Sequence, residues 1–326
     1  MCIYCAIMSG KSAATITGTS GNDILASTGD YDSIFSLGGD DTIHLNHFQV
    51  SVTPGSGSNS VFFADDGSTS NSHANFHYEE FTSKITVSVT QSEVTVDKGS
   101  DGTDAITGFS PNNPASLSLN LGSGDDVVTA DYDGDVGLLS LTASGGDGND
   151  FMVGGDGIDM LVGDAGNDTI YAGANDSGLD RLDGGDGDDV LGGGSGKDFV
   201  TGGDGEDVLF GASGDDYMSG GLGSDQVFGG AGDDTVRGGE GDASDTLYGG
   251  EGDDYYYFDA DFGDDFIGGF DAIDSDKIDL FQLGLSGFED LTITQSDTDT
   301  VVDTGQGTIT LWNVAASDIT EDDFFL

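Results

Sequence analysis

The chain has 326 residues, with 62 acidic side chains against 7 Lys and Arg, so its formal net charge is −55. A polyanion of this size repels nucleic acid and anionic lipid surfaces, which excludes both as partners. The sequence contains no run of about eighteen apolar residues that could cross a membrane as a helix.

Residues 1–17 are predicted to form an N-terminal tail. Its first eight residues lack the basic region and the long apolar segment of a secretory signal peptide. Cys2 and Cys5 form a Cys-x-x-Cys pair, but a structural zinc site needs four ligands and a redox motif needs a supporting βαβ unit. We therefore interpret the two cysteines as incidental or as a locally oxidised pair.

A nine-residue phrase, Gly-Gly-x-Gly-x-Asp-x-apolar-x, begins after this tail. Residues 18–26 fit the phrase, and the next two groups of nine keep its register. Their sixth positions are Asp23, Asp32 and Asp41. Residues 18–44 are therefore predicted to form a short first β-roll segment.

Residues 45–144 keep the phrase only once, at 121–129, with Asp126 in the sixth position. Strand-like runs alternate there with turns rich in Ser, Gly and Asn, at 85–89, 94–96, 117–121 and 138–142. We interpret the segment as irregular coils of a solenoid, with a separate small β-sandwich as the alternative. The longest loop is expected within residues 51–75.

Residues 145–257 repeat the phrase twelve times in tandem, which is the most specific signal in the sequence. The fourth position is always Gly, the sixth is always Asp, and the eighth is always apolar or aromatic. Two units are longer than nine residues, with insertions at 175–177 and near Asp242. Both insertions fall in the turn half of the unit, where loops are tolerated.

Each position of the phrase has a physical reason. Glycine lets the turn adopt φ > 0 and brings backbone carbonyls close together, and Asp adds an anionic oxygen beside them. The last three residues read as a short strand whose middle side chain points to one side. The repeat therefore predicts an all-β fold, a right-handed parallel β-roll or β-solenoid, with the eighth-position residues inside.

The phrase resembles the calcium-binding nonapeptide of the RTX (repeats-in-toxin, hemolysin-type) family. In that family two nonapeptides form one coil, and each Ca²⁺ lies between the turn of one unit and the turn two units later. The resemblance implies ligands from turn carbonyls and sixth-position carboxylates, and such all-oxygen coordination suits a hard cation. Twelve units allow ten pairings, an upper bound because Asp164, Ala172 and Ala212 replace Gly in three turns.

The aspartates implied as ligands are Asp23, Asp32, Asp41, Asp126, Asp150, Asp159, Asp168, Asp180, Asp189, Asp198, Asp207, Asp216, Asp225, Asp234, Asp245 and Asp254. The glycines implied as ligands are Gly146, Gly148, Gly155, Gly157, Gly166, Gly185, Gly187, Gly194, Gly196, Gly203, Gly205, Gly214, Gly221, Gly223, Gly230, Gly232, Gly239, Gly241, Gly250 and Gly252. Because the chain repels itself and each unit buries only one apolar side chain, we predict that it is unfolded without Ca²⁺ and folded with it.

Residues 258–326 leave the phrase and read as short strands at 277–280, 291–294, 300–303 and 308–312. We predict that they cap the open end of the roll. Residues 317–323 and the ending 323–326 resemble the C-terminal module of serralysin-like and other proteins that Gram-negative bacteria export by type I secretion. The resemblance implies a secreted, extracellular or cell-surface protein that meets the type I secretion machinery.

No catalytic motif is recognisable in the sequence. His73 and His77 are four residues apart, and His44 and His47 are three apart, but the zinc-protease pattern His-Glu-x-x-His is absent. We therefore predict a noncatalytic calcium-binding protein with a structural, adhesive or surface or matrix role. The alternative is a secreted enzyme or polysaccharide-binding protein whose site lies in residues 45–144, with the roll supporting folding and secretion.

Overall fold

The computed structural model describes residues 14–27, 32–45, 50–56, 60–63, 73–77, 86–89, 93–97, 103–107, 116–130, 140–173, 178–241, 243–260, 262–271 and 275–326. The chain divides into two compact units, residues 1–164 and 165–326. Within the described ranges the only helices are three short 3-10 helices, η2 (Phe281–Leu283), η3 (Phe288–Asp290) and η4 (Glu321–Asp323).

The strands of the first unit alternate between two sheets, called A and B. In order of pairing, sheet A contains β1 (Thr15–Thr17), β3 (Ser33–Phe35), β5 (Val50–Thr53), β7 (His73–His77), β11 (Ser116–Ser123) and β13 (Ser140–Asp147). Sheet B contains β2 (Ile24–Ala26), β4 (Thr42–Leu45), β6 (Ser60–Phe63), β10 (Thr103–Thr107), β9 (Glu93–Asp97), β8 (Thr86–Val89), β12 (Val127–Ala130) and β14 (Phe151–Val153). The strand β15 (Met160–Ala165) lies at the end of this unit.

The first unit is a parallel solenoid with one antiparallel insertion. All pairs in sheet A from β1 to β13 are parallel. In sheet B, β9 pairs antiparallel with both β8 and β10, and these two outer strands pair parallel with β12 and β6. The expectation of a long loop at 51–75 is wrong in part, because β6 and the start of β7 lie there.

The strands of the second unit continue the same alternation. In order of pairing, sheet A contains β17 (Arg181–Asp186), β19 (Phe199–Asp204), β21 (Tyr217–Leu222), β23 (Thr235–Gly239), β25 (Tyr255–Tyr257), β27 (Lys277–Asp279) and β31 (Phe324–Phe325). Sheet B contains β16 (Thr169–Tyr171), β18 (Val190–Ser195), β20 (Val208–Ser213), β22 (Gln226–Ala231), β24 (Thr246–Glu251), β26 (Asp264–Gly268), β30 (Thr308–Trp312), β29 (Asp299–Asp303) and β28 (Thr292–Ser296).

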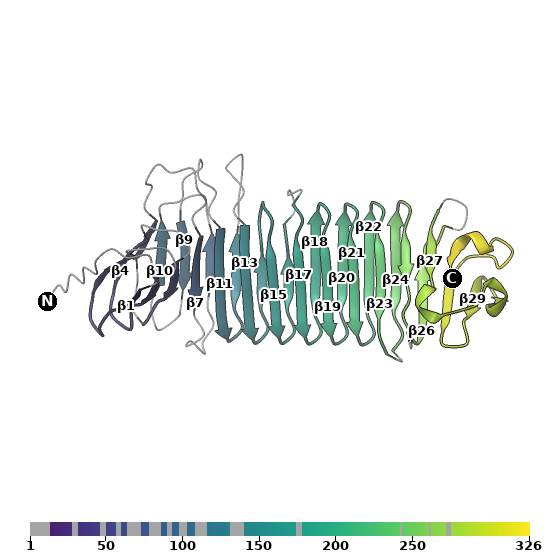
Figure 1. Ribbon diagram of the computed structural model, residues 1–326, viewed down its shortest axis with the longest axis horizontal. Coiled ribbons are helices and arrows are strands. Elements are labelled where there is room, and N and C mark those ends of the chain that lie inside the picture. The colour runs from purple at the N-terminus through teal and green to yellow at the C-terminus, as the bar shows by residue number, and fades with distance from the viewer. Residues whose placement is uncertain are drawn as a thin grey trace. The chain divides into compact units, whose positions relative to one another are not determined.

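Equal positions of the phrase stack on one another in the second unit, whose strands lie side by side from β17 to β27 in Figure 1. In sheet B, for example, Leu191 pairs with Leu209 and Leu209 with Val227. All eighth-position side chains from Met152 to Tyr256 are at most 2% exposed. The parallel β-roll predicted from the repeat, with these residues as its core, is therefore confirmed.

The C-terminal strands predicted for the cap are present. The strand β30 pairs parallel with β26, and β29 and β28 add to it antiparallel. Aromatic side chains fill the end of the core, where the rings of Phe258 and Phe262 lie 4.9 Å apart. Parallel pairing extends past residue 257 through β26 and β27. The division of the chain at residues 17, 44, 144 and 257 stays a prediction.

The turns of most units adopt a left-handed backbone at the second and fourth positions. Gly203 has φ 124° and Gly205 has φ 144°. A Cβ at Gly205 would overlap the carbonyl oxygen of Gly187 in the preceding coil. Asp164 and Ala212 replace glycine at the second position and still have φ 74° and 79°. The turn conformation is thus set by the stacking of coils and not by glycine alone.

Two glycines in the fourth position allow a matched test of this stacking. At Gly241, φ is also positive at 120°, but nothing lies within 4 Å of the place that a Cβ would take. We expect Gly241→Ala to cost about 1–2 kcal/mol of folding free energy from the left-handed backbone alone. Gly205→Ala should cost about 1–3 kcal/mol more, because the coils must also move apart. Urea unfolding of the calcium-loaded variants measures both, and equal losses would contradict the stacking account.

Candidate metal centre

The sixth-position aspartates form columns of buried carboxylates. All of the predicted aspartates except Asp23 are 0–3% exposed. Aspartate is almost never buried to this degree unless its charge is paired. The arrangement therefore requires that each carboxylate be paired with a cation or neutralised by a proton.

One carboxylate oxygen of each aspartate is engaged by the preceding coil. The backbone N–H of Asp189 donates to Oδ1 of Asp207 at 2.8 Å, and that of Asp207 donates to Oδ1 of Asp225 at 2.9 Å. The same bond recurs along both edges of the second unit as far as Asp276. Its N–O distances are 2.7 to 3.1 Å. These bonds fix the carboxylate orientation and align the coils.

The other carboxylate oxygen, Oδ2, accepts no hydrogen bond in several of these residues. It is buried and has no hydrogen-bond partner in Asp189, Asp207, Asp216, Asp225, Asp234, Asp254 and Asp265. A buried anionic oxygen without a partner is costly in free energy. An ion that binds at this atom would remove the cost.

Glycine in the first position of the unit keeps the space beside Oδ2 open. A Cβ at Gly202 would overlap both Oδ2 of Asp207 and the carbonyl oxygen of Gly220. Equivalent overlaps occur at Gly184, Gly211, Gly220 and Gly229. A carboxylate oxygen and a carbonyl oxygen of the next coil therefore border the same small space. The sequence prediction included only the second and fourth glycines, so it missed this first-position carbonyl.

The predicted turn glycines all have the conformation that the motif demands. Each of the twenty has a positive φ, between 96° and 150°. Many of their carbonyls stack on the equivalent glycine of the next coil, as the carbonyl of Gly185 does on Gly203. Their role as calcium ligands stays a prediction.

The donor set fits a hard cation. Nowhere in the described ranges do three His, Cys, Asp or Glu side chains gather in the way a side-chain metal site needs. A site here would join carboxylate oxygens to backbone carbonyls, and such an all-oxygen set suits Ca²⁺ and disfavours Zn²⁺. Asp207, with the turn carbonyls beside it, exemplifies the residues that would hold the ion.

Burial raises the pKa of these carboxyl groups. Lost hydration is the largest cause, and the neighbouring sixth-position carboxylates add to it for Asp189, Asp225 and Asp234, whose pKa rises from 3.8 to about 7. Burial also raises the pKa of Asp207 and Asp254 to about 6. Without a cation, the columns therefore hold protons more tightly than free aspartates do.

The first unit contains the same carboxylate bond, with one exception. The N–H of Asp23 donates to Oδ1 of Asp41 at 2.8 Å, and that of Asp126 donates to Oδ1 of Asp150 at 2.7 Å. Asp23 itself differs, because its Oδ2 accepts bonds from the N–H and the hydroxyl of Thr19 at 2.6 and 2.8 Å. Thr19 stands where the phrase has its second glycine, so this oxygen is already satisfied.

Two members of the columns were missed in the sequence. Asp265 and Asp276 accept the N–H groups of Asp245 and Asp254 at 2.9 and 3.1 Å. Both precede an x-apolar pair, which is the signal that could have found them. Gly263, with φ 84°, keeps the fourth-position glycine before Asp265, whereas the turn before Asp276 has lost its glycines. Burial raises the pKa of Asp265 to about 8. Asp276 ends its column, because its Oδ2 accepts the N–H of Asp271 at 2.8 Å.

Of the remaining candidate residues, His44 alone has a described side chain. Cys2, Cys5 and His47 lie outside the described residues, as do the side chains of His73 and His77. His44 lies in β4. No described helix is long and apolar enough to span a membrane.

A family model and several solved structures relate the chain to known proteins. Residues 17–46, 144–179, 175–209, 192–227, 210–244 and 228–267 match the family model of the RTX calcium-binding nonapeptide repeat (4 copies). No curated protein matches the chain. The solution structure of the AlgE6R3 subunit from the Azotobacter vinelandii mannuronan C5-epimerase is similar at 30% identity and TM-score 0.31, covering 44% of this chain and 80% of that one.

A second solved structure is similar over nearly the whole chain. The crystal structure of the extracellular lipase LipA from Serratia marcescens is 18% identical, with a TM-score of 0.30. The match covers 98% of this chain and 40% of the lipase. The chain thus spans well under half the length of that enzyme.

The raised pKa values give the metal-free fold a defined pH dependence. These groups have an ordinary pKa of 3.8 when unfolded and about 6 to 8 when folded, so the folded state binds more protons. Its stability must therefore fall as the pH rises from about 4 to about 8. In metal-free buffer, circular dichroism should show more β-structure at pH 5 than at pH 8. A β signal that grows with pH in the absence of metal would contradict the burial of these carboxyl groups.

Proposed function

The chain belongs to the RTX family of calcium-binding nonapeptide-repeat proteins, and from this premise we propose that it folds by binding Ca²⁺ outside the cell. The observation that carries the proposal is the set of buried Oδ2 atoms without hydrogen-bond partners, of which those of Asp189, Asp207, Asp216, Asp225 and Asp234 each lie beside a turn carbonyl. Cations at these atoms would neutralise the columns. Ten ions, the upper bound from the repeat count, would change the net charge from −55 to −35.

Calcium concentration would decide where the chain folds. Extracellular calcium modules bind with dissociation constants of about 10⁻⁴ to 10⁻³ M, so they are empty in a cytosol and filled outside. Binding to the folded state alone would shift the folding equilibrium by mass action. A chain exported while unfolded would then fold on arrival, which fits passage through a type I secretion machinery and a secreted or surface location.

The role of the folded protein would be structural or adhesive. Each unit is a stack of coils in its described residues, and the chemistry that repeats from coil to coil lies in the carboxylate columns at the turns. The C-terminal strands cover the end of the second unit, with Phe324 buried beside Phe288 at a ring distance of 5.7 Å. Stacked coils whose end is covered, as in the second unit, suit a spacer or an adhesive module at the surface or in the matrix.

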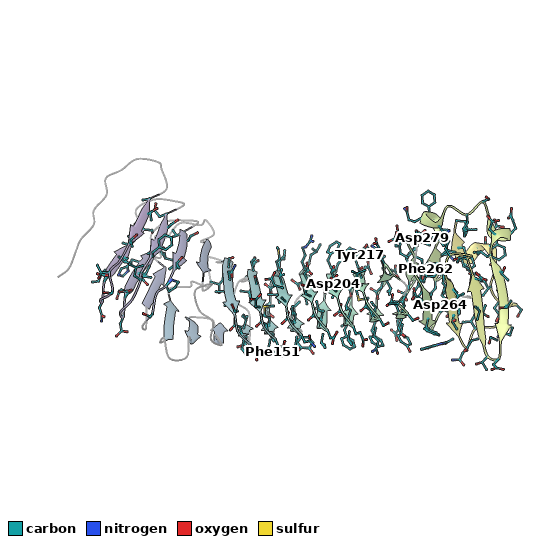
Figure 2. The ribbon with its side chains drawn as sticks, turned by 90° about the horizontal axis from the view of Figure 1, so that it is seen from below. Phe151, Asp204, Tyr217, Phe262, Asp264 and Asp279 are labelled. Carbon is teal, nitrogen blue, oxygen red and sulfur yellow. The ribbon has the colours of Figure 1, made fainter. Side chains whose placement is uncertain are left out.

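Replacing one buried carboxylate tests the ligand assignment. Asp207→Asn keeps the acceptor for the Asp189 N–H but removes the charge beside the Gly220 carbonyl. We expect binding at the sites that use Asp207 to weaken at least about tenfold, because affinity follows ligand charge. Isothermal titration with Ca²⁺ measures the change. The matched control is Asp204→Asn, an exposed residue at the end of β19 that is labelled in Figure 2, which should shift affinity less than about twofold. Equal effects of the two changes would refute the assignment.

The single Trp312 reports folding at the cap. Its ring lies 6.1 Å from Tyr248 and 5.5 Å from Phe266, so its surroundings exist only when β24, β26 and β30 are paired. Adding Ca²⁺ to chelated protein should shift its emission to shorter wavelength together with the gain of β signal. Zn²⁺ at the same concentration should leave both unchanged. A response to Zn²⁺ without one to Ca²⁺ would overturn the proposal.

A further inference from the structure

The outer face of sheet B in the second unit carries no charged side chain at its strand centres. From β16 to β30, the seventh and ninth positions flank the buried eighth position and face outward. These fourteen residues, called the uncharged stripe, are Thr169, Tyr171, Val190, Gly192, Val208, Phe210, Gln226, Phe228, Thr246, Tyr248, Phe266, Gly268, Thr310 and Trp312.

The composition of the chain does not explain the stripe. The twelve equivalent positions of sheet A, from β17 to β27, include five charged residues: Arg181, Asp183, Arg237, Lys277 and Asp279. The turns on either side of the stripe carry exposed carboxylates, among them those of Asp188, Glu206, Asp215 and Asp233. An uncharged strip between two acidic margins is therefore specific to this one face.

Aromatic rings run along the stripe. The rings of Phe210 and Phe228 are 5.2 Å apart and 12° from parallel, and those of Phe228 and Tyr248 are 5.0 Å apart and 7° from parallel. Carbon atoms in contact are about 3.5–4.0 Å apart, so parallel rings at this spacing overlap only in part. Each ring then leaves some of its face uncovered.

Two glycines let tyrosine rings lie across the neighbouring strand. A Cβ at Gly192 would overlap the ring of Tyr171, and a Cβ at Gly268 would overlap the ring of Tyr248. Each ring thus packs directly against the backbone of the next coil. Tyr171 remains 39% exposed in this position. Flat rings backed by the sheet form a platform rather than a row of isolated side chains.

The dimensions of the stripe favour a linear ligand. Seven strands at about 4.8 Å give a length of about 29 Å, while the seventh and ninth positions lie only about 7 Å apart. The resulting strip covers about 200 Å², whereas a stable protein interface buries about 800 Å² on each partner. A strip this long and narrow matches one extended polymer chain better than a second protein.

We propose that the uncharged stripe binds an uncharged linear polysaccharide. A sugar ring presents C–H groups on its faces, which pack on aromatic faces, and hydroxyl groups at its rim. The Tyr248 hydroxyl, the Trp312 N–H and the Thr246 hydroxyl are placed along the stripe to bond that rim. The acidic margins would repel an anionic polymer. Because the rings are aligned by the coils, this inference rests on the proposed calcium-dependent folding.

Affinity electrophoresis of the calcium-loaded chain tests the stripe. The gels contain hydroxyethyl cellulose as the uncharged polymer or alginate as the polyanion. The test variant is Tyr171→Thr with Phe210→Thr, both on the stripe and both 39% exposed. The matched control is Tyr217→Thr with Tyr255→Thr, on sheet A at 38% and 42% exposure; Tyr217 is labelled in Figure 2.

We expect hydroxyethyl cellulose to retard the wild type and the sheet A control, and alginate to retard neither. The stripe variant should bind about tenfold more weakly, because two aromatic contacts are lost. Circular dichroism at rising Ca²⁺ checks folding of each variant, and Phe210→Leu replaces the pair if the pair does not fold. A wild type that fails to fold with Ca²⁺ would overturn the proposed function itself.

Three outcomes would overturn the polysaccharide assignment while leaving calcium-dependent folding intact. The first is a folded wild type that hydroxyethyl cellulose does not retard. The second is an equal loss of retardation in the sheet A control. The third is a wild type that light scattering shows to be a dimer and that the stripe variant converts to a monomer, which would assign the face to a second copy of the chain.

Discussion

The structure depends on the burial of carboxylates in columns. Each sixth-position aspartate sits one coil from the next, about 4.8 Å away, with Oδ1 bonded to the preceding coil. Two unit charges about 5 Å apart repel by about 3 kcal/mol at an effective dielectric constant of about 20. A column can therefore close only when protons or cations neutralise it, and at neutral pH a divalent cation does so most fully.

This constraint divides the phrase into positions that are fixed and positions that are free. The first glycine must leave room beside Oδ2, as Gly202 does beside Asp207, and the eighth residue must fill the core. The seventh and ninth positions face outward and touch neither the ion nor the core. Their side chains can differ between the two sheets without disturbing the coil. The contrast between the charged face of sheet A and the uncharged stripe of sheet B uses this freedom.

The repeat predicted the core and the turns because its period ties each residue type to one place in the coil. Where the period lapses, prediction failed for physical reasons. The antiparallel strands β8 to β10 come from a segment with no phrase, so nothing indicated their direction. Asp276 is the last aspartate of a column although its turn has lost the glycines. The hydroxyl of Thr19 donates to Oδ2 of Asp23, and a repeat pattern does not predict such a side-chain hydrogen bond. The uncharged stripe could not be recognised in the sequence, because its residues come together only when alternate units are placed in the same sheet.

Crystals grown with Ca²⁺ allow the most direct test of the central claim, that the buried columns are the calcium sites. Anomalous difference maps locate each ion independently of the fold. We expect peaks beside the Oδ2 atoms of Asp189, Asp207 and Asp225, within reach of the turn carbonyls. Peaks confined to exposed carboxylates such as those of Asp188 and Glu206, with none beside the buried Oδ2 atoms, would contradict the account.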